Sequence, residues 1–360
     1  MDKACAERRQ SVQDRLGALK IFIACPLYFK GVHTSLPNSR DLWHQLFRKC
    51  FLDSFFEYII NLKSHTFTTM HPQNPYGERY DLKRLAKHYP TLQEYIVLNP
   101  SGEETIDFSS SRAVYALNKA MLLADFKLAD YHLPTGYLIP PIPGRLDYLL
   151  HVRDFLSEKF SIDVDSKLRG LDIGTGANGI YCILGAQHFN WTMVGTESDA
   201  TAIKIALANL QHTKGLLDNV ELRHQEHKSF LFKNMIQSDE RFDFTICNPP
   251  FHSSREEAVK GSLRKLKNLE GQTHKKEFSL NFEGQANELW CNGGEALFIK
   301  RLIRESILFK DQVKVFTSLV AKTDNLPKIE KQLKKAKANY HIIPMTQGNK
   351  KSRLIAWEFG

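Results

Sequence analysis

The tetrapeptide Asn248-Pro249-Pro250-Phe251 has the residue types of a site for a flat molecule that carries an amino group. Two consecutive prolines fix the backbone and remove two N–H donors, so nearby carbonyls stay free to accept hydrogen bonds. Asn248 and the carbonyl of Pro249 could accept both amino hydrogens while Phe251 stacks on the ring. This would localise the nitrogen lone pair and activate a weak nucleophile such as the exocyclic amine of adenine. An ordinary turn is the alternative, because Asn-Pro favours turns.

A glycine-rich turn lies upstream and could hold a nucleoside-type cofactor. Residues 169–173 predict a strand, and the residues from Ile180 to about Gln187 predict a helix. Between them, Gly174 and Gly176 allow a tight turn and close approach of a ligand to the helix N-terminus. Asp172 precedes the first glycine, which is typical of cofactor loops, although a carboxylate there could also be a helix cap or turn residue.

An acidic residue completes this pattern. The apolar run 191–196 predicts a second strand, and it ends in Glu197, whose carboxylate can accept the hydroxyl groups of a ribose. The run 242–247 predicts the strand that leads into Asn248. Because ligands of parallel sheets bind at the carboxyl ends of the strands, we expect Gly174, Glu197 and Asn248 to converge on one edge. A dehydrogenase would fit the glycine turn but would leave the tetrapeptide without a role.

The elements around these residues predict an α/β fold of the doubly wound, Rossmann-like class. We expect a mostly parallel seven-stranded sheet with helices on both faces, closed by a C-terminal antiparallel hairpin. The further predicted helices begin near Asp81, at Ser110 or Ser111, at Asp199 (running to about Gln211) and after Ser229; helical residues are also expected at 284–304 around a break at Gly293-Gly294, and at 325–337. The further predicted strands are 220–223, 313–320 and the hairpin strands 340–345 and 353–359.

Three regions are expected along the chain. Residues 1–69 form an N-terminal extension without a recognisable motif, and translation could naturally start at Met70; a small helical accessory domain is the alternative. Residues 70–160 form a substrate-binding module, and residues 161–360 form the catalytic domain. The segment 133–145 is too proline-rich for regular structure, so we expect the next helix at about Leu146. Arg145 would then lie across the site and bind a carboxylate of the cofactor, unless it pairs with a surface acid.

Composition limits the possible partners. The chain has 360 residues and a formal net charge of +9, which favours an anionic partner such as nucleic acid. The six cysteines contain no CxxC pair, so neither a zinc site nor a disulfide framework is indicated, and a reducing cytoplasm fits. The longest early apolar run, 21–29, is too short to span a membrane and makes a poor signal peptide. We expect a monomer without a metal.

Two basic segments could contact phosphate groups. The stretch 252–281 has seven Lys or Arg against four Glu, and the stretch 328–353 has eight against Glu330 alone. The second cluster exceeds what solubility needs, although a solvated face is the alternative. The side chains that we expect to bind RNA are Arg264, Lys265, Lys267, Lys350, Lys351 and Arg353.

The chain resembles one family closely, the bacterial adenine-N6 methyltransferases of 23S ribosomal RNA called the RlmF family, which has eukaryotic small nuclear RNA methyltransferases as relatives. The resemblance covers about 70–360. It is carried by Asn118-Lys119-Ala120-Met121-Leu122-Leu123, Pro140-Pro141-Ile142-Pro143-Gly144-Arg145, Leu171-Asp172-Ile173-Gly174-Thr175-Gly176-Ala177-Asn178, Cys247-Asn248-Pro249-Pro250-Phe251, Asn281-Phe282-Glu283-Gly284-Gln285, Glu288-Leu289-Trp290-Cys291 and Thr317-Ser318-Leu319-Val320.

The resemblance implies S-adenosylmethionine as cofactor and 23S rRNA, or an assembly intermediate of the large subunit, as substrate. It implies that the cofactor is held by Arg145, the Gly174 and Gly176 turn with Asp172, Glu197 and Ser229, and the target base by Asn248 to Phe251. Where the family often has Asp-x-Asp, this chain has Glu197-Ser198-Asp199. Glutamine methylation in proteins, adenine methylation in DNA, and a non-catalytic RNA-binding or assembly role are the alternatives.

Overall fold

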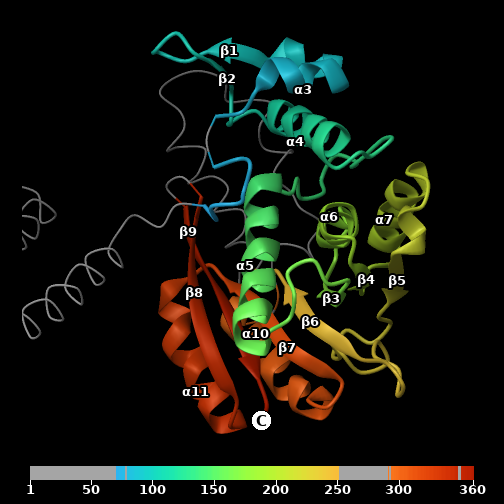
Figure 1. Cartoon of the computed structure of the whole chain (residues 1–360), viewed down its shortest axis with the longest axis vertical. Helices are drawn as coiled ribbons and strands as arrows, with labels where there is room; N and C mark the ends of the chain where they lie inside the picture. Colours follow the sequence, from blue (N-terminus) through green and yellow to red (C-terminus); the bar gives the residue numbers. More distant parts are fainter. Residues whose placement is uncertain (1–69, 78, 251–290, 292, 348–349) are drawn as a thin grey trace, which may run out of the picture. The chain divides into compact units, whose positions relative to one another are not determined.

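The computed structural model describes residues 70–77, 79–250, 291, 293–347 and 350–360 (Figure 1). The chain divides into two compact units, Met1–Phe67 and Thr68–Gly360, and every described residue belongs to the second. The predicted extension 1–69 and the site residues Phe251, Arg264, Lys265 and Lys267 lie outside the described residues. The predicted boundary between 160 and 161 stays a prediction.

A seven-stranded sheet forms the centre of the second unit, with strand order β5-β4-β3-β6-β7-β9-β8. The first five strands in this order are parallel, whereas β9 pairs antiparallel with both β7 and β8. This confirms the predicted fold class, with its parallel strands and closing hairpin. The strands are β3 (Arg169–Ile173), β4 (Thr192–Glu197), β5 (Val220–His224), β6 (Phe242–Cys247), β7 (Val313–Val320), β8 (Asn339–Gln347) and β9 (Lys350–Glu358).

Helices cover both faces of the sheet and bury its apolar side chains in two clusters. One cluster lies under α5 (Ile142–Phe160), which crosses in front of the sheet in Figure 1, and under α6 (Ile180–Phe189). The other cluster lies under α10 (Gly294–Ser306) and α11 (Leu326–Ala336). The crossover between β4 and β5 is α7 (Ala200–His212), and short 3₁₀ helices η3 (Leu216–Asp218), η4 (Ile307–Phe309) and η5 (Thr323–Asn325) join other elements.

The residues before α5 form a smaller set of elements beside the sheet. They are α3 (Leu82–His88), the 3₁₀ helix η2 (Pro90–Tyr95), the hairpin of β1 (Ile96–Leu98) and β2 (Glu104–Ile106), and α4 (Ser111–Asp125). The predicted caps Ser110 and Asp199 and the predicted helix start near Asp81 are confirmed, because these side chains accept hydrogen bonds from the first turns that follow them. The caps are Asp81 for α3, Ser110 for α4 and Asp199 for α7.

Two expected elements differ from the structure. Helix α5 begins at Ile142 and not near Leu146, because Pro143 lies in the first turn, where a missing N–H costs no helical hydrogen bond. Arg145 is therefore helical. The expected helix after Ser229 does not form, and that segment consists of turns. The carboxylate of Glu305, far away on α10, accepts hydrogen bonds from the backbone N–H groups of residues 231–233 at 2.8 to 2.9 Å and so replaces helical partners.

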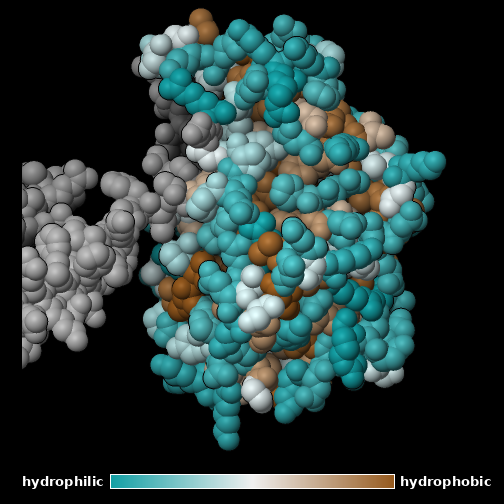
Figure 2. Space-filling view, in the orientation of Figure 1, coloured by the Kyte–Doolittle hydropathy of each residue, from teal (hydrophilic) through white to brown (hydrophobic). Residues whose placement is uncertain are grey.

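Hydrophilic residues dominate the face of the molecule that Figure 2 shows. Large exposed apolar side chains such as Leu98, Phe108 and Leu308 are scattered over different elements. Within the described ranges, no helix combines the length and the apolar character that crossing a bilayer requires.

Candidate active site

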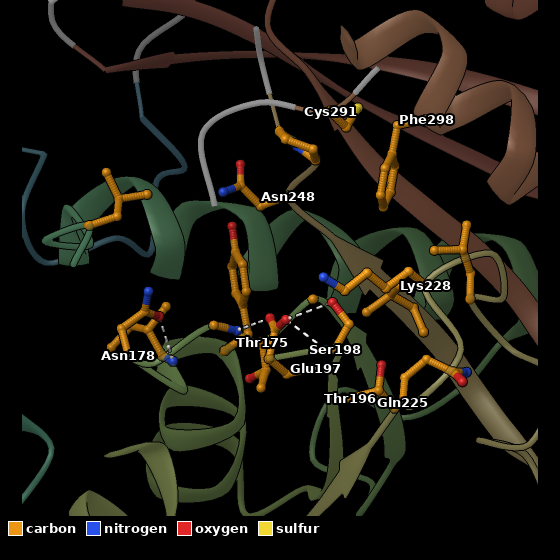
Figure 3. Close-up of a pocket in the computed structure, with 18 of the residues that line it drawn as sticks. Thr175, Asn178, Thr196, Glu197, Ser198, Gln225, Lys228, Asn248, Cys291 and Phe298 are labelled. Atoms are coloured by element: carbon orange, nitrogen blue, oxygen red, sulfur yellow. Dashed lines mark hydrogen bonds between the residues drawn. The ribbon is translucent and has the colours of Figure 1, made fainter. Parts of the chain in front are cut away.

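A cavity of about 440 Å³ opens at the carboxyl ends of β3, β4, β5 and β6 (Figure 3). Its position follows from the parallel arrangement of these strands, whose ends meet at one edge of the sheet. Residues separated by more than 100 positions in the sequence share its wall. Six residues that we expected in the site line this cavity, namely Arg145, Gly174, Gly176, Glu197, Asn248 and Pro250.

The glycine turn after β3 forms one wall. Gly174 and Gly176 have φ values of 75° and 64°, a conformation that side-chain-bearing residues rarely adopt. A Cβ atom added to Gly174 would have no heavy atom within 4 Å, so its backbone faces open space in the cavity. The N–H groups of Gly174 and Thr175 both donate to the carbonyl of Thr196 at 2.9 Å, which ties the turn to β4.

Glu197 fixes the other side of this turn. Its Oε2 accepts a hydrogen bond from the N–H of Gly176 at 3.1 Å, and its Oε1 accepts from the N–H groups of Ser198 and Asp199 at 2.6 and 3.0 Å. The hydroxyl of Ser198 also donates to Oε1 at 3.3 Å, so backbone and side-chain donors together orient the carboxylate. A carboxylate oxygen has two lone pairs, so Oε2 can accept one further hydrogen bond from a ligand hydroxyl.

Replacing Gly174 with alanine tests the role of the turn. The change would strain the backbone by about 1 to 2 kcal/mol and place a methyl group in the cavity. Gly102, in the turn between β1 and β2, is a matched control, because its φ is 77° and an added Cβ would also meet nothing within 4 Å. We expect a similar loss of stability in both variants. By calorimetry, only Gly174→Ala should weaken S-adenosylhomocysteine binding, roughly tenfold, or about 1.4 kcal/mol; equal affinities would contradict this.

Arg145 projects from the first turn of α5 into the cavity. It is only 8% exposed, and its Nη1 donates to the hydroxyl of Tyr181 at 2.8 Å. Its Nε is buried without a hydrogen-bond partner among the described residues, and no carboxylate of those residues forms an ion pair with it. The guanidinium therefore has donors left for an anion in the cavity, such as the carboxylate of an amino acid.

The N-terminal elements hold the helix turn that carries Arg145. The side-chain oxygen of Asn118 on α4 accepts a hydrogen bond from the N–H of Ile142 at 2.9 Å. The amide of Asn74 donates to the carbonyl of Pro143 at 2.9 Å. Both asparagines are buried, so these hydrogen bonds fix the beginning of α5 and with it the direction of the guanidinium.

Asp172 lies in β3 behind the glycine turn and does not line the cavity. It is 1% exposed, and its Oδ1 has no hydrogen-bond partner among the described residues. Burial raises the pKa of Asp172 to about 7, although a hydrogen bond with Thr175 and the charge of Arg145 lower it. The structure therefore shows a buried carboxyl behind the glycine turn and not a helix cap.

This burial predicts a pH-dependent stability. Because the folded chain holds the proton of Asp172 more tightly than the unfolded chain, the free energy of unfolding should fall as the pH rises from about 4 to about 7. A pKa change from 3.8 to about 7 corresponds to at most about 4 kcal/mol. Denaturant unfolding at pH 5 and pH 8 should show the wild type losing stability relative to Asp172→Asn; parallel curves would contradict the prediction.

Asn248 follows β6 and enters the cavity opposite Glu197 and Thr175 (Figure 3). Its Oδ1 is buried and has no hydrogen-bond partner among the described residues. Leaving a buried amide oxygen unpaired costs about 1 to 3 kcal/mol, so the native fold keeps this acceptor at an energetic cost. Pro250 lines the cavity and Pro249 is buried beside it. The arrangement presents an acceptor to a ligand donor.

Several lining residues were not expected from the sequence. Gln225 directly follows β5, so the rule that identified Glu197 at the end of β4 could have found it. Ser229 is exposed and does not line the cavity, whereas its neighbours Lys228 and Phe230 do. Other lining side chains project from helices or precede them, and no local pattern marks them. Among them are Tyr181, Cys291, Phe298 and Arg301.

The C-terminal hairpin carries the other basic residues that we expected to bind RNA. Lys350 begins β9, Lys351 is exposed, and Arg353 is half-buried. In the register of the sheet, Arg353 lies between Val320 of β7 and Pro344 of β8. Lys351 and Arg353 therefore belong to the strand that joins the hairpin to the parallel sheet.

Comparisons with known proteins identify the family. A family model described as RNA methyltransferase matches residues 64–360. The chain belongs to this RNA methyltransferase family. It is 50% identical over 290 residues to the Ribosomal RNA large subunit methyltransferase F of Christiangramia forsetii, which covers 81% of this chain and 100% of that protein. The enzyme of the same name from Pseudomonas entomophila is 46% identical over 296 residues, covering 81% of this chain and 93% of that protein. These relatives confirm the RlmF resemblance.

Solved structures agree with this family. The human METTL16 catalytic domain in complex with the MAT2A 3′UTR hairpin 1 superposes with a TM-score of 0.67 at 28% identity, covering 81% of this chain and 96% of that one. The N-terminal domain of human METTL16 in complex with SAH gives a TM-score of 0.64 at 26% identity, covering 81% and 99%. The chain therefore shares the fold of a human protein domain that has been solved with SAH bound.

Proposed function

We propose that this protein transfers the methyl group of S-adenosylmethionine to N6 of one adenine in 23S rRNA, in the cytoplasm. Two observations support the substrate: the names of the bacterial relatives, and the unpaired acceptor that Asn248 presents beside the glycine turn. The observation that carries the proposal is the buried Oδ1 of Asn248. A hydrogen-bond acceptor in that place selects a ligand with an amino group.

The cavity fits S-adenosylmethionine through three features of this chain. The open backbone at Gly174 leaves room for the cofactor, Glu197 can accept a ribose hydroxyl, and the free donors of Arg145 can bind the cofactor carboxylate. When bound, the cofactor supplies an electrophilic methyl group on a sulfonium. We infer no role for Ser229, because it lies outside the cavity wall.

The residues after β6 would prepare the nucleophile. Asn248 Oδ1 and the carbonyl of Pro249 accept the two hydrogens of the adenine amine, so the lone pair on N6 localises as attack begins. The new bond forms between N6 and the methyl carbon while the bond from that carbon to sulfur breaks. The methylated amine then loses one proton to water, and S-adenosylhomocysteine leaves. No strong base is needed before methyl transfer.

The target adenine must leave its stack to reach this cavity. Flipping costs a few kcal/mol and least in an unpaired loop. Stacking on Phe251, which follows the described part of the strand end, would return about 1 to 3 kcal/mol. We propose that Arg264, Lys265, Lys267, Lys350, Lys351 and Arg353 contact phosphate groups around the flipped nucleotide.

Mapping of N6-methyladenosine in rRNA by mass spectrometry tests the proposal. Ribosomal RNA from cells that lack the gene should miss one modified adenine in the large subunit, and the purified protein should restore it with S-adenosylmethionine. Naked rRNA and assembly intermediates should be compared as substrates. An unchanged set of modified adenines in the gene-deficient cells would refute the assignment.

A further inference from the structure

The strands β6 and β7 separate just before the catalytic loop. Their ladder contains the pairs Phe242–Val313 and Phe244–Val315. In a regular parallel ladder the next pair would let the N–H of Thr317 donate to the carbonyl of Thr245, and the N–H of Cys247 donate to the carbonyl of Thr317. Side-chain hydroxyl groups take these places. The end of β6 is thus disconnected from β7 one residue before Asn248.

The replacement hydrogen bonds form a directed chain. Thr317 Oγ1 donates to the carbonyl of Thr245 at 2.6 Å, so its only proton is used there. The hydroxyl of Tyr148 lies 2.7 Å from Thr317 Oγ1 and must therefore be the donor in that pair. Its oxygen is left to accept the N–H of Cys247 at 3.5 Å. The N–H of Thr317 donates to Thr245 Oγ1 at 3.3 Å.

Burial makes the loss of any hydrogen bond in this series costly. Tyr148 and Thr317 are both 0% exposed, so water cannot replace a lost partner. Burial also raises the pKa of Tyr148 well above its ordinary value, which keeps the hydroxyl protonated and able to donate. Hydrogen bonds in a chain of low dielectric strengthen one another, so the members act as a unit.

Tyr148 also lies on the helix that carries Arg145, so one helix contacts both the cofactor side of the site and the end of β6. It lies three residues after Arg145 on α5, and residues with that spacing lie on the same helix face. Its ring packs edge-on against Tyr181 with centroids 5.5 Å apart, and Tyr181 in turn bonds Arg145 at 2.8 Å. One face of α5 therefore contacts the cofactor side through Arg145 and the strand end before Asn248 through Tyr148.

We propose that Tyr148 is a positioning residue, which together with Thr317 sets the place of Asn248 relative to the cofactor. This inference rests on the proposed function, in which Asn248 binds the target amine. By holding the N–H of Cys247 away from β7, the hydroxyl chain directs the next residue into the cavity. Methyl transfer needs the attacking nitrogen and the methyl carbon in line at close range, and a misplacement of 1 Å can cost about a hundredfold in rate.

The test is turnover under single-turnover conditions with saturating RNA and cofactor, beside calorimetric binding of S-adenosylhomocysteine. Tyr148→Phe keeps the aromatic ring and loses the hydroxyl. Thr317→Val keeps the shape of the side chain and loses the hydroxyl that links Tyr148 to the carbonyl of Thr245. Each should lower the rate by about tenfold to a hundredfold and leave the binding constant within twofold. Thr317→Ser retains a hydroxyl and should restore most of the rate. The double variant should be no slower than the slower single variant, because both break one chain.

Ser306→Ala is the matched control for lost stability. Ser306 is also 0% exposed, and its hydroxyl accepts the indole N–H of Trp357 at 3.0 Å and donates to the carbonyl of Ile303 at 2.8 Å. It ends α10, five residues or about 7.5 Å along the helix beyond Arg301, and it does not line the cavity itself. Its melting temperature should fall about as far as that of Tyr148→Phe, with an unchanged rate.

If the wild type is active and Asn248→Ala is inactive, three results would overturn the role of Tyr148 and leave the proposed function standing. They are wild-type rates in Tyr148→Phe and Thr317→Val, a loss of cofactor binding that matches the loss of rate, and additive effects in the double variant. A wild type that does not methylate adenine, or an active Asn248→Ala variant, would overturn the proposed function and this inference with it.

Discussion

Asn248→Ala should lower the rate of methyl transfer by about a hundredfold to a thousandfold while S-adenosylhomocysteine binds as in the wild type. The size follows from the removal of a preorganised hydrogen-bond partner that acts on the transition state. In the wild type this acceptor is already buried and unpaired within the described structure, so it reorganises little during the reaction. Single-turnover methylation and calorimetry measure the two quantities separately.

Asn219→Ala provides a matched control for this change. Asn219 accepts a hydrogen bond from Lys167 Nζ at 2.9 Å and precedes β5, at the edge of the sheet opposite the cavity. Its replacement removes the same atoms and should leave the rate within twofold. The role of Asn248 would be wrong if its alanine variant transferred methyl groups at the wild-type rate, or if it lost cofactor affinity as strongly as rate.

Arg145→Met should weaken S-adenosylhomocysteine binding by about tenfold to a hundredfold. Methionine keeps much of the apolar stem, and the loss of a charged hydrogen bond is worth about 1.5 to 3 kcal/mol. The ligand 5′-methylthioadenosine lacks the amino acid carboxylate. If Arg145 binds that carboxylate, affinity for 5′-methylthioadenosine should stay within about twofold in the same variant.

Arg153→Met on the same helix is the control for a general effect of losing an arginine. Arg153 pairs with Asp154 at 2.6 Å and lies eight residues, or about 12 Å, after Arg145. Both ligands should bind it as they bind the wild type. Equal losses for both ligands in Arg145→Met would show that the guanidinium supports the cavity wall and does not recognise a carboxylate.

The parallel strands were predictable because both of their faces are covered. The mainly apolar runs predicted at 242–247 and 313–320 coincide with β6 and β7, since a strand buried on two sides needs mostly apolar side chains. The carboxyl ends of such strands must meet, so Gly174, Glu197 and Asn248 could be placed together before any coordinates existed.

Elements that depend on distant partners were not predictable. The turns at 231–233 form because the carboxylate of Glu305 accepts hydrogen bonds from three successive N–H groups. A local sequence pattern cannot predict a partner that lies more than 70 residues away. For the same reason Tyr181 and Arg301 were missed, because helical periodicity does not say which face of a helix meets a cavity. Pro143 misled the prediction in another way, since proline is compatible with a first helical turn.

The support that Asn74 and Asn118 give to the start of α5 has a consequence for protein engineering. A fragment cut at residue 161 would keep every parallel strand and yet lack Arg145 and Tyr148. Chimeras that exchange the N-terminal residues up to 160 between relatives would likewise exchange α5 together with the asparagines that anchor it. Cofactor affinity in such a chimera would then depend on the N-terminal piece of chain as well as on the parallel strands.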